Sequence, residues 1–271
     1  YRGKRLVNWD PVLMSAVSDL EVESEEEDGS LWHIRYPLAD GSGDITVATT
    51  RPETMLGDSA VMVHPDDERY QHLIGKKVHL PLCNRQLTII ADDYVDKEFG
   101  TGVVKVTPAH DKADFEIAQR HNLPAVDVMH PNGVLNELAG KDLAGMERFA
   151  ARKRAAELLT EIGSLVKEEP YQNNVGHSER ADVPIESRLS EQWFLKYPSV
   201  KESQAVVANG EMKFHPDRWA KVYDHWMTGL QDWCISRQVW WGHRIPVWSK
   251  TVTTTLREAL LEVSGVMIQD I

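Results

Sequence analysis

Short β-like runs, recurring about every ten residues, constrain the fold of this chain most strongly. Between Leu20 and about Met129, runs rich in β-branched residues alternate with Gly, Pro and Asp. The runs are 20–26, 31–38, 44–50, 60–64, 77–82, 86–91 and 102–107. Asp28-Gly29, between the first two runs, is a hairpin signal. This spacing favours a barrel or a sandwich over a doubly wound sheet.

Two helices are predicted among these runs. One covers residues 112–121 and the other about 146–162, where Gly163 is a plausible C′ stop. Residues 168–184 are polar and rich in turn formers, which predicts a loop. Trp219, Val222 and Trp226 then follow a helical stripe, and we interpret this tryptophan-rich segment as the core of a separate subdomain. The prediction is therefore an α+β, β-rich fold that is barrel-like and carries flanking helices.

Composition excludes several classes of protein. Hydrophobic residues make up 42% of the 271 positions, and no apolar run is long enough for a transmembrane helix. The net charge of −12 gives no bulk electrostatic case for binding nucleic acid, although a local basic patch could supply one. Cys83 and Cys234 form no disulfide scaffold, and no residues have zinc-ligand spacing. We expect a cytoplasmic protein without a bound metal.

The chain begins Tyr1-Arg2-Gly3 without an initiator Met or the apolar core of a signal peptide. We therefore expect a piece of a longer protein, whose function would be only part of the function of the whole.

The first segment with chemical potential is Thr49-Thr50-Arg51, at the end of a predicted strand. Two hydroxyls and a guanidinium at a strand end could meet a ligand, since an arginine fork suits a phosphate or a carboxylate. Alternatively, Arg51 pairs with Glu53 or Asp58 and the segment only ends the strand.

The second segment is a strand–turn–helix junction. Lys105 and Thr107 share one face of a strand, and His110, Asp111 and Asp114 follow within ten residues of Lys105. Asp111 and Asp114 could simply cap the helix. Their convergence with a lysine and a histidine also suits the orientation of a water or the binding of an ammonium group.

These segments resemble those of valyl-tRNA synthetases, which are class I aminoacyl-tRNA synthetases. The resemblance rests on TTRPETMLGD (49–58), GTGVVKVTPAHDKAD (100–114), FEIAQRHNLP (115–124), LSEQWF (189–194) and DWCISRQVWWGHRIP (232–246). They occur in the family's order and cover most of the chain. The isoleucine and leucine enzymes differ at residues 51–54, and residues 250–271 resemble nothing in the family.

The resemblance implies an editing domain inserted into a Rossmann catalytic domain. Residues 1–19 would be a connecting stalk, residues 20–175 the editing domain, and residues 176–271 a return linker with a partial catalytic segment. The implied reaction is hydrolysis of the ester in mischarged Thr-tRNA(Val). The alternative is a module that binds the tRNA 3′ end and is inactive without the rest of the synthetase.

The resemblance also implies roles for individual residues. Asp114 would hold the substrate ammonium, and Asp111 or Asp114 would recognise the threonine hydroxyl. Thr49 and Thr50 would contact substrate or water. The remaining expected pocket residues are Arg51, Phe99, Lys105, Thr107 and His110, and Trp241 would form part of the synthetic valine pocket.

Both ATP signatures of class I synthetases are absent from this sequence. We therefore expect that this chain does not activate valine, that editing needs no cofactor, and that ATP and Mg²⁺ belong only to the full-length enzyme. The expected partners are the 3′ end of tRNA(Val) and threonine, with no membrane, and the chain is expected to be a monomer.

Overall fold

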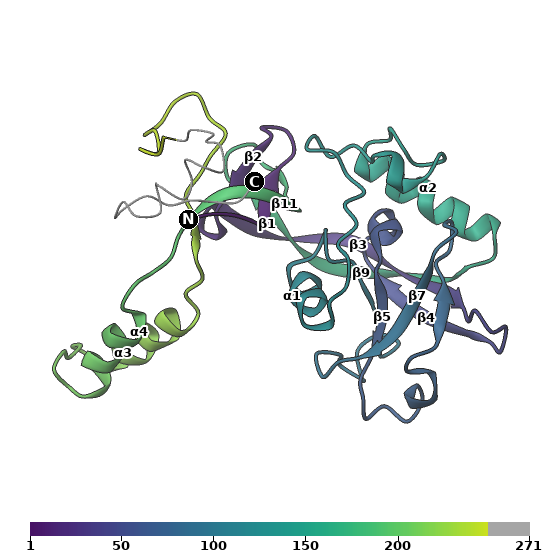
Figure 1. Cartoon of the computed structure of the whole chain (residues 1–271), viewed down its shortest axis with the longest axis horizontal. Helices are drawn as coiled ribbons and strands as arrows, with labels where there is room; N and C mark the ends of the chain where they lie inside the picture. The colour runs from purple at the N-terminus through teal and green to yellow at the C-terminus, as the bar shows by residue number, and fades with distance from the viewer. Residues whose placement is uncertain (249–271) are drawn as a thin grey trace, which may run out of the picture. The chain divides into compact units, whose positions relative to one another are not determined.

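The computed structural model describes residues 1–248 and confirms a β-rich α+β fold (Figure 1). The helices are α1 (Lys112–His121), α2 (Arg148–Glu161), α3 (Val200–Ala208) and α4 (Arg218–Thr228). The strands are β1 (Arg2–Asp10), β2 (Ser15–Val17), β3 (Val22–Pro37), β4 (Asp44–Thr49), β5 (Ala60–Val63), β6 (Lys77–His79), β7 (Gln86–Ala91), β8 (Val103–Val106), β9 (Leu165–Ser178), β10 (Val183–Pro184), β11 (Glu186–Leu195) and β12 (Trp233–Cys234). None of the helices described is both long enough and apolar enough to cross a membrane.

The chain divides into two compact units, Tyr1–Gln238 and Val239–Ile271. All the helices and strands above belong to the first unit. The described part of the second unit, residues 239–248, has no helix or strand. The predicted segment 250–271 lies outside the described residues. The boundaries predicted near residues 19 and 175 stay predictions.

Within the described residues, the strands form three open sheets of four strands each. Their orders are β12-β11-β1-β2, β10-β9-β3-β4 and β6-β7-β5-β8. β4 and β8 come close to each other, and an isolated antiparallel bridge joins Leu38 to Val78 of β6, but no longer ladder links these two sheets. The structure therefore shows no closed barrel within residues 1–248, because closure requires hydrogen bonding around the whole circumference.

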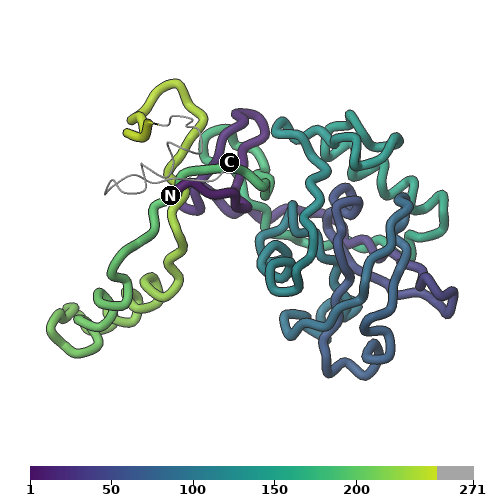
Figure 2. Tube along the Cα trace, in the orientation of Figure 1, coloured from purple at the N-terminus to yellow at the C-terminus, as the bar shows by residue number. Residues whose placement is uncertain are grey.

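β3 and β9 form a long antiparallel ribbon, and they run side by side in both views (Figures 1 and 2). Two sequence predictions were wrong here. The hairpin expected at Asp28-Gly29 is an uninterrupted part of β3, because β9 pairs with β3 from Val22 to Ile34. The loop expected at 168–184 is largely β9. Much of this ribbon is solvated, so its polar residues lack the apolar alternation that usually reveals a strand.

The main hydrophobic core lies between β3, β4, β5, β7 and α2. Tyr36 and Ile34 of β3 are fully buried there, together with Val47 of β4 and Leu159 of α2. A separate cluster under β1, β2 and β11 contains Trp9 and Phe194. The large core holds the loop between β4 and β5, where Met55 and Leu56 are buried, and thus fixes the first of the two predicted site segments.

The predicted helices α1 and α2 are confirmed, and Gly163 has the positive φ of 70° expected after a helix. The subdomain core predicted from the tryptophans is wrong. Neither α3 nor α4 buries a residue, and Trp219 and Trp226 are exposed. A helical stripe shows that a helix is amphipathic, but it does not show that a partner surface covers the apolar face.

Candidate functional site

Two predicted residues at the end of β8 meet Asp58, which lies just before β5. The hydroxyl of Thr107 donates to Oδ1 of Asp58 at 2.7 Å, and Nζ of Lys105 lies 3.5 Å from the same oxygen. The Lys105 ammonium also donates to the Thr107 hydroxyl. Tyr36 of β3 donates to Oδ2 of Asp58 at 2.7 Å. The antiparallel pairing of β5 with β8 places these groups together in a network that is almost fully buried.

The first turn of α1 joins this network through Asp114. The backbone N–H of Thr107 donates to Oδ2 of Asp114 at 2.8 Å. Asp111 is the exposed N-cap of the helix, and its Oδ1 accepts the backbone N–H of Asp114 at 3.0 Å. The capping interpretation is therefore confirmed for Asp111. Asp114 is different, because it is 7% exposed and faces the end of β8.

Burial alters the acidity of both inner carboxyl groups. Desolvation raises the pKa of Asp114 to about 7, although the nearby Lys105 ammonium opposes the shift. Desolvation also raises the pKa of Asp58, against the opposing effect of Lys105. A carboxyl group with a pKa near neutrality can gain or lose a proton during a reaction at physiological pH. Asp114 is therefore the group of this network most suited to chemistry.

Arg51 belongs to a second network. Its Nε donates to Glu53 at 3.0 Å and its Nη2 donates to Glu186 at 2.6 Å. Arg148 and Arg152 of α2 complete the network by pairing with Glu186 at 2.7 Å and with Glu53 at 2.9 Å. The predicted pairing of Arg51 with Glu53 is confirmed, while Glu186 takes the place considered for Asp58. This network ties the loop after β4 to α2 and to the start of β11.

His110 lies near both networks and is neutral. Burial, together with the positive charge of Arg51, lowers its pKa to about 4. The backbone N–H of Val128 donates to Nε2 of His110 at 3.1 Å, so the ring proton is on Nδ1. Nδ1 is buried without a hydrogen-bond partner in the described residues. With its Nε2 lone pair engaged, His110 is poorly suited to act as a base.

The other predicted residues lie outside the two networks. The Thr49 hydroxyl accepts the backbone N–H of Arg51 at 3.0 Å, which shapes the turn, and Thr50 is half-buried. Phe99 is 54% exposed and makes an edge contact with Tyr171 of β9. Trp241 is exposed and belongs to the second compact unit.

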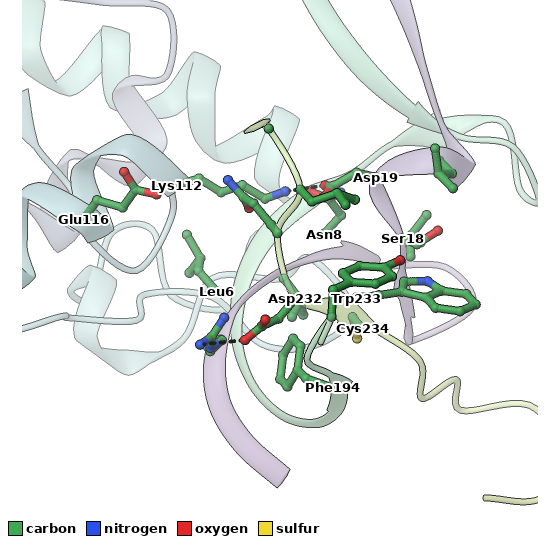
Figure 3. A pocket seen from close by; sticks show the side chains of 18 of the residues that line it. Leu6, Asn8, Ser18, Asp19, Lys112, Glu116, Phe194, Asp232, Trp233 and Cys234 are labelled. Atoms are coloured by element: carbon green, nitrogen blue, oxygen red, sulfur yellow. Dashed lines mark hydrogen bonds and ion pairs between the residues drawn. The ribbon is translucent and has the colours of Figure 1, made fainter. Parts of the chain in front are cut away.

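A cavity of about 1010 Å³ contains none of the predicted site residues. It lies against β1, β12, α1 and the end of α4 (Figure 3). Lys112 pairs with Asp19 at 2.6 Å in its wall, and Arg5 pairs with Asp232 at 3.3 Å. The Asp114 network is the stronger candidate site, because it holds a buried carboxyl group whose pKa lies near neutrality.

Comparison with known proteins decides the family. Residues 1–266 match the family described as tRNA synthetases class I (I, L, M and V). The chain belongs to this family. It is 55% identical over 249 residues to valine--tRNA ligase of Legionella pneumophila (strain Lens), and 56% identical over 249 residues to that of Coxiella burnetii (strain RSA 493). It is 57% identical over 250 residues to that of Thermosynechococcus vestitus (strain NIES-2133). The predicted resemblance to valyl-tRNA synthetases is confirmed.

The chain spans about a quarter of the length of these relatives, since each match covers 92% of the chain and 27% of the relative. A solved LeuRS of Agrobacterium radiobacter K84, in a ternary complex with tRNA and LeuAMS, overlaps 72% of this chain and 31% of its own. The TM-score of 0.41 and the identity of 16% make this a partial overlap.

Four residues of the two networks in this class I synthetase chain were missed by the sequence reasoning. Tyr36 lies in the predicted strand run 31–38, and Glu186, Arg148 and Arg152 lie in segments without a motif. Asp58 and Glu53 were noted only as possible partners of Arg51. The one available signal was the resemblance over residues 49–58, which ends on Asp58.

One group in the described residues has the composition and spacing of a metal site. Glu25, His177 and Asp182 each offer a ligand atom, and these atoms lie within 4.8 Å of one another. None of the three belongs to the predicted site.

Proposed function

We propose that this chain is the editing part of a valyl-tRNA synthetase and hydrolyses the ester of mischarged Thr-tRNA(Val). The observation that carries the proposal is the position of Asp114. Its carboxyl group is held by the Thr107 amide at 2.8 Å, beside the Lys105–Thr107–Asp58 network, and it is nearly buried. Such a carboxylate can bind the ammonium of an aminoacyl ester, with charge-assisted hydrogen bonds that a shielded site strengthens.

The need for a second site follows from the shapes of the two amino acids. Threonine is isosteric with valine and exchanges a methyl group for a hydroxyl. A hydrophobic pocket rejects such an isostere poorly, as is known for valine enzymes themselves. A second pocket that hydrogen-bonds the hydroxyl reverses the preference, because bound valine leaves buried polar groups unpaired. The Thr107 hydroxyl and the carboxyl groups of Asp114 and Asp111 are the groups we assign to this recognition.

The nucleophile in the proposed reaction is water. The ammonium of Lys105 acts electrostatically on Asp114, and it suits stabilisation of the charge that develops on the ester oxygen. Arg51 is already bound by two carboxylates, so we assign it to holding the loop that presents Thr49 and Thr50 to substrate or water. Phe99, which is exposed, is proposed to pack on the terminal adenosine.

The membership of the synthetase family also suggests roles for the full-length enzyme and for the remaining segments of this chain. The full-length enzyme would ligate valine to tRNA(Val) with ATP and Mg²⁺, which this chain does not do because both ATP signatures are absent from it. Residues 20–175 are proposed as the editing domain and residues 176–271 as the return toward the Rossmann catalytic domain. Trp241 is proposed as part of the synthetic valine pocket.

One experiment separates this proposal from a module that only binds the tRNA 3′ end. The full 271-residue chain is incubated with Thr-tRNA(Val), and in parallel with Val-tRNA(Val), and amino-acid release is followed. Release of threonine, but not of valine, supports the hydrolase. Binding of tRNA(Val) without release supports the binding module. Equal release of both amino acids contradicts editing at this site.

A further inference from the structure

Three ligand-type side chains, far apart in sequence, converge on one face of the β3–β9–β10 sheet. Glu25 comes from β3, His177 from β9, and Asp182 from the turn that precedes β10. One ligand atom of each lies within 4.8 Å of the others. β3 pairs with β9 at Glu23 and His177, and β9 pairs with β10 at His177 and Pro184, so His177 lies between the other two elements.

The histidine is held in a state suited to a metal. Its Nε2 lies 2.7 Å from the carboxylate of Glu27, an acceptor, so the ring proton is on Nε2. Nδ1 is then a lone-pair acceptor, and it is buried without any hydrogen-bond partner in the described residues. His177 itself is only 9% exposed. Metal-binding histidines usually donate their second ring N–H to a carboxylate in this way.

The negative charges of Glu25 and Asp182 have no positive partner in the described residues. Glu25 and Asp182 are exposed, and neither forms an ion pair within residues 1–248. Like charges at this separation repel each other, and a bound cation removes that repulsion. A buried acceptor without a partner is also unfavourable by itself. One divalent cation would satisfy the orphan nitrogen and neutralise both carboxylates.

We propose that Glu25, His177 Nδ1 and Asp182 form a site for a divalent transition-metal ion, with Zn²⁺ as the reference ion. One imidazole and two carboxylates suit zinc, with water as the fourth ligand. In a tetrahedral site, ligand atoms about 2.1 Å from the metal lie about 3.4 Å from one another. The exposed carboxylates therefore rotate toward the fixed histidine when the ion binds. The ion links β3 to the corner between β9 and β10, where Ser178 also bonds Asp10 of β1 at 2.7 Å.

The test is calorimetric titration of ZnCl₂ into the chelator-washed full chain. The expected result is one saturable site per chain, with affinity reduced at least tenfold in Glu25→Gln and Asp182→Asn. Glu27→Gln, which loses the partner of Nε2, should weaken binding about tenfold. Glu26→Gln is the matched control, because Glu26 is an exposed neighbour on the opposite face of the same strand. Its affinity should equal that of the unmodified chain.

Two further measurements keep the result unambiguous. The melting temperature of each metal-free variant checks that the fold is intact, and both ligand variants change exposed side chains. A Cys83→Ser, Cys234→Ser double variant should retain the site, which excludes zinc held by thiols. Absence of saturable binding, or equal affinities for Glu25→Gln and Glu26→Gln, would overturn the proposal. Threonine release is a separate measurement, so the outcome here is independent of the proposed hydrolase.

Discussion

The hydroxyl of Thr107 donates a hydrogen bond to Oδ1 of Asp58 at 2.7 Å, across 49 positions of sequence. Thr107 is 1% exposed and Asp58 is fully buried. The bond connects the end of β8 to the loop before β5, and it places the hydroxyl between the Lys105 ammonium and a carboxylate. The proposed recognition of a substrate hydroxyl depends on this arrangement, because the groups are already oriented before any ligand arrives.

Thr107→Val keeps the side-chain shape and removes the hydroxyl. Asp58 and Lys105 then lose a buried partner, which should lower the free energy of unfolding by about 1–3 kcal/mol. The ratio of the rate of threonine release to the rate of valine release should also fall toward one. Thr160→Val, on the exposed face of α2, is the control and should change stability by less than about 0.5 kcal/mol. Urea unfolding measures the first effect, and a change no larger than that of the control would contradict it.

Asp114→Ala should abolish threonine release while the protein remains folded. The reason is that the carboxylate is the proposed partner of the substrate ammonium, whereas loss of its hydrogen bond from the Thr107 amide should lower the free energy of unfolding by only about 1–3 kcal/mol. Asp111→Asn is the matched variant, since asparagine is an equally good N-cap. If Asp111 only caps the helix, this variant keeps its activity. Deacylation rates and melting curves are measured together, and near-normal release by Asp114→Ala would exclude the assigned role.

The raised pKa of Asp114 predicts a definite pH dependence of stability. Its pKa is about 7 in the folded chain and about 3.9 in an unfolded chain. The folded state therefore holds the proton more tightly, and the stabilisation is complete below about pH 4 and lost as pH rises to about 7. Relative to Asp114→Asn, the free energy of unfolding should fall by up to about 1.4 kcal/mol per pH unit in this window. Identical pH profiles for the two proteins would show that Asp114 titrates normally.

His110 should make the free energy of unfolding depend on pH in the opposite direction. Its pKa is about 4 when folded and about 6.5 when unfolded, so the unfolded chain binds the proton more tightly. The stability from neutral His110 is present above about pH 6.5 and lost as pH falls to about 4. Comparison of the wild type with His110→Asn, by chemical unfolding at several pH values, isolates this contribution. A difference between the two proteins that is constant with pH would contradict the buried neutral state.

Glu186→Gln tests the second network. Glu186 is 5% exposed and pairs with Arg51 and Arg148, the latter 4% exposed. Removing one partner of a buried ion pair costs up to about 3–5 kcal/mol; Arg51 keeps Glu53, so the cost falls mainly on the buried Arg148, whose other carboxylate, Glu147, lies 3.7 Å away. Arg154→Gln, which breaks exposed pairs on α2, is the control and should leave stability unchanged. Equal melting temperatures for the two variants would show that the network is not structural.

Local sequence patterns predicted a large part of the secondary structure. The run 86–91 is β7 and the stretch 112–121 is α1, because apolar periodicity and a capping aspartate are local signals. The same reasoning failed for β9, whose polar residues form a strand because β3 pairs with almost its whole length. The tryptophan stripe correctly predicted helix α4, but its apolar face is not buried within the described residues, so the predicted core is absent there.

The sequence by itself determined the family and the position of the junction from Lys105 to Asp114, and it offered capping as one of two roles for Asp111; each depends on residues close together in the chain. Tertiary structure alone decided which distant groups meet. Asp58 joins Thr107, Glu186 joins Arg51, and His177 joins Glu25, across separations that no local pattern encodes. The physical reason is that burial and charge compensation are properties of the packed chain. The raised pKa of Asp114 arises from desolvation, which exists only once β8, α1 and the loop before β5 have come together.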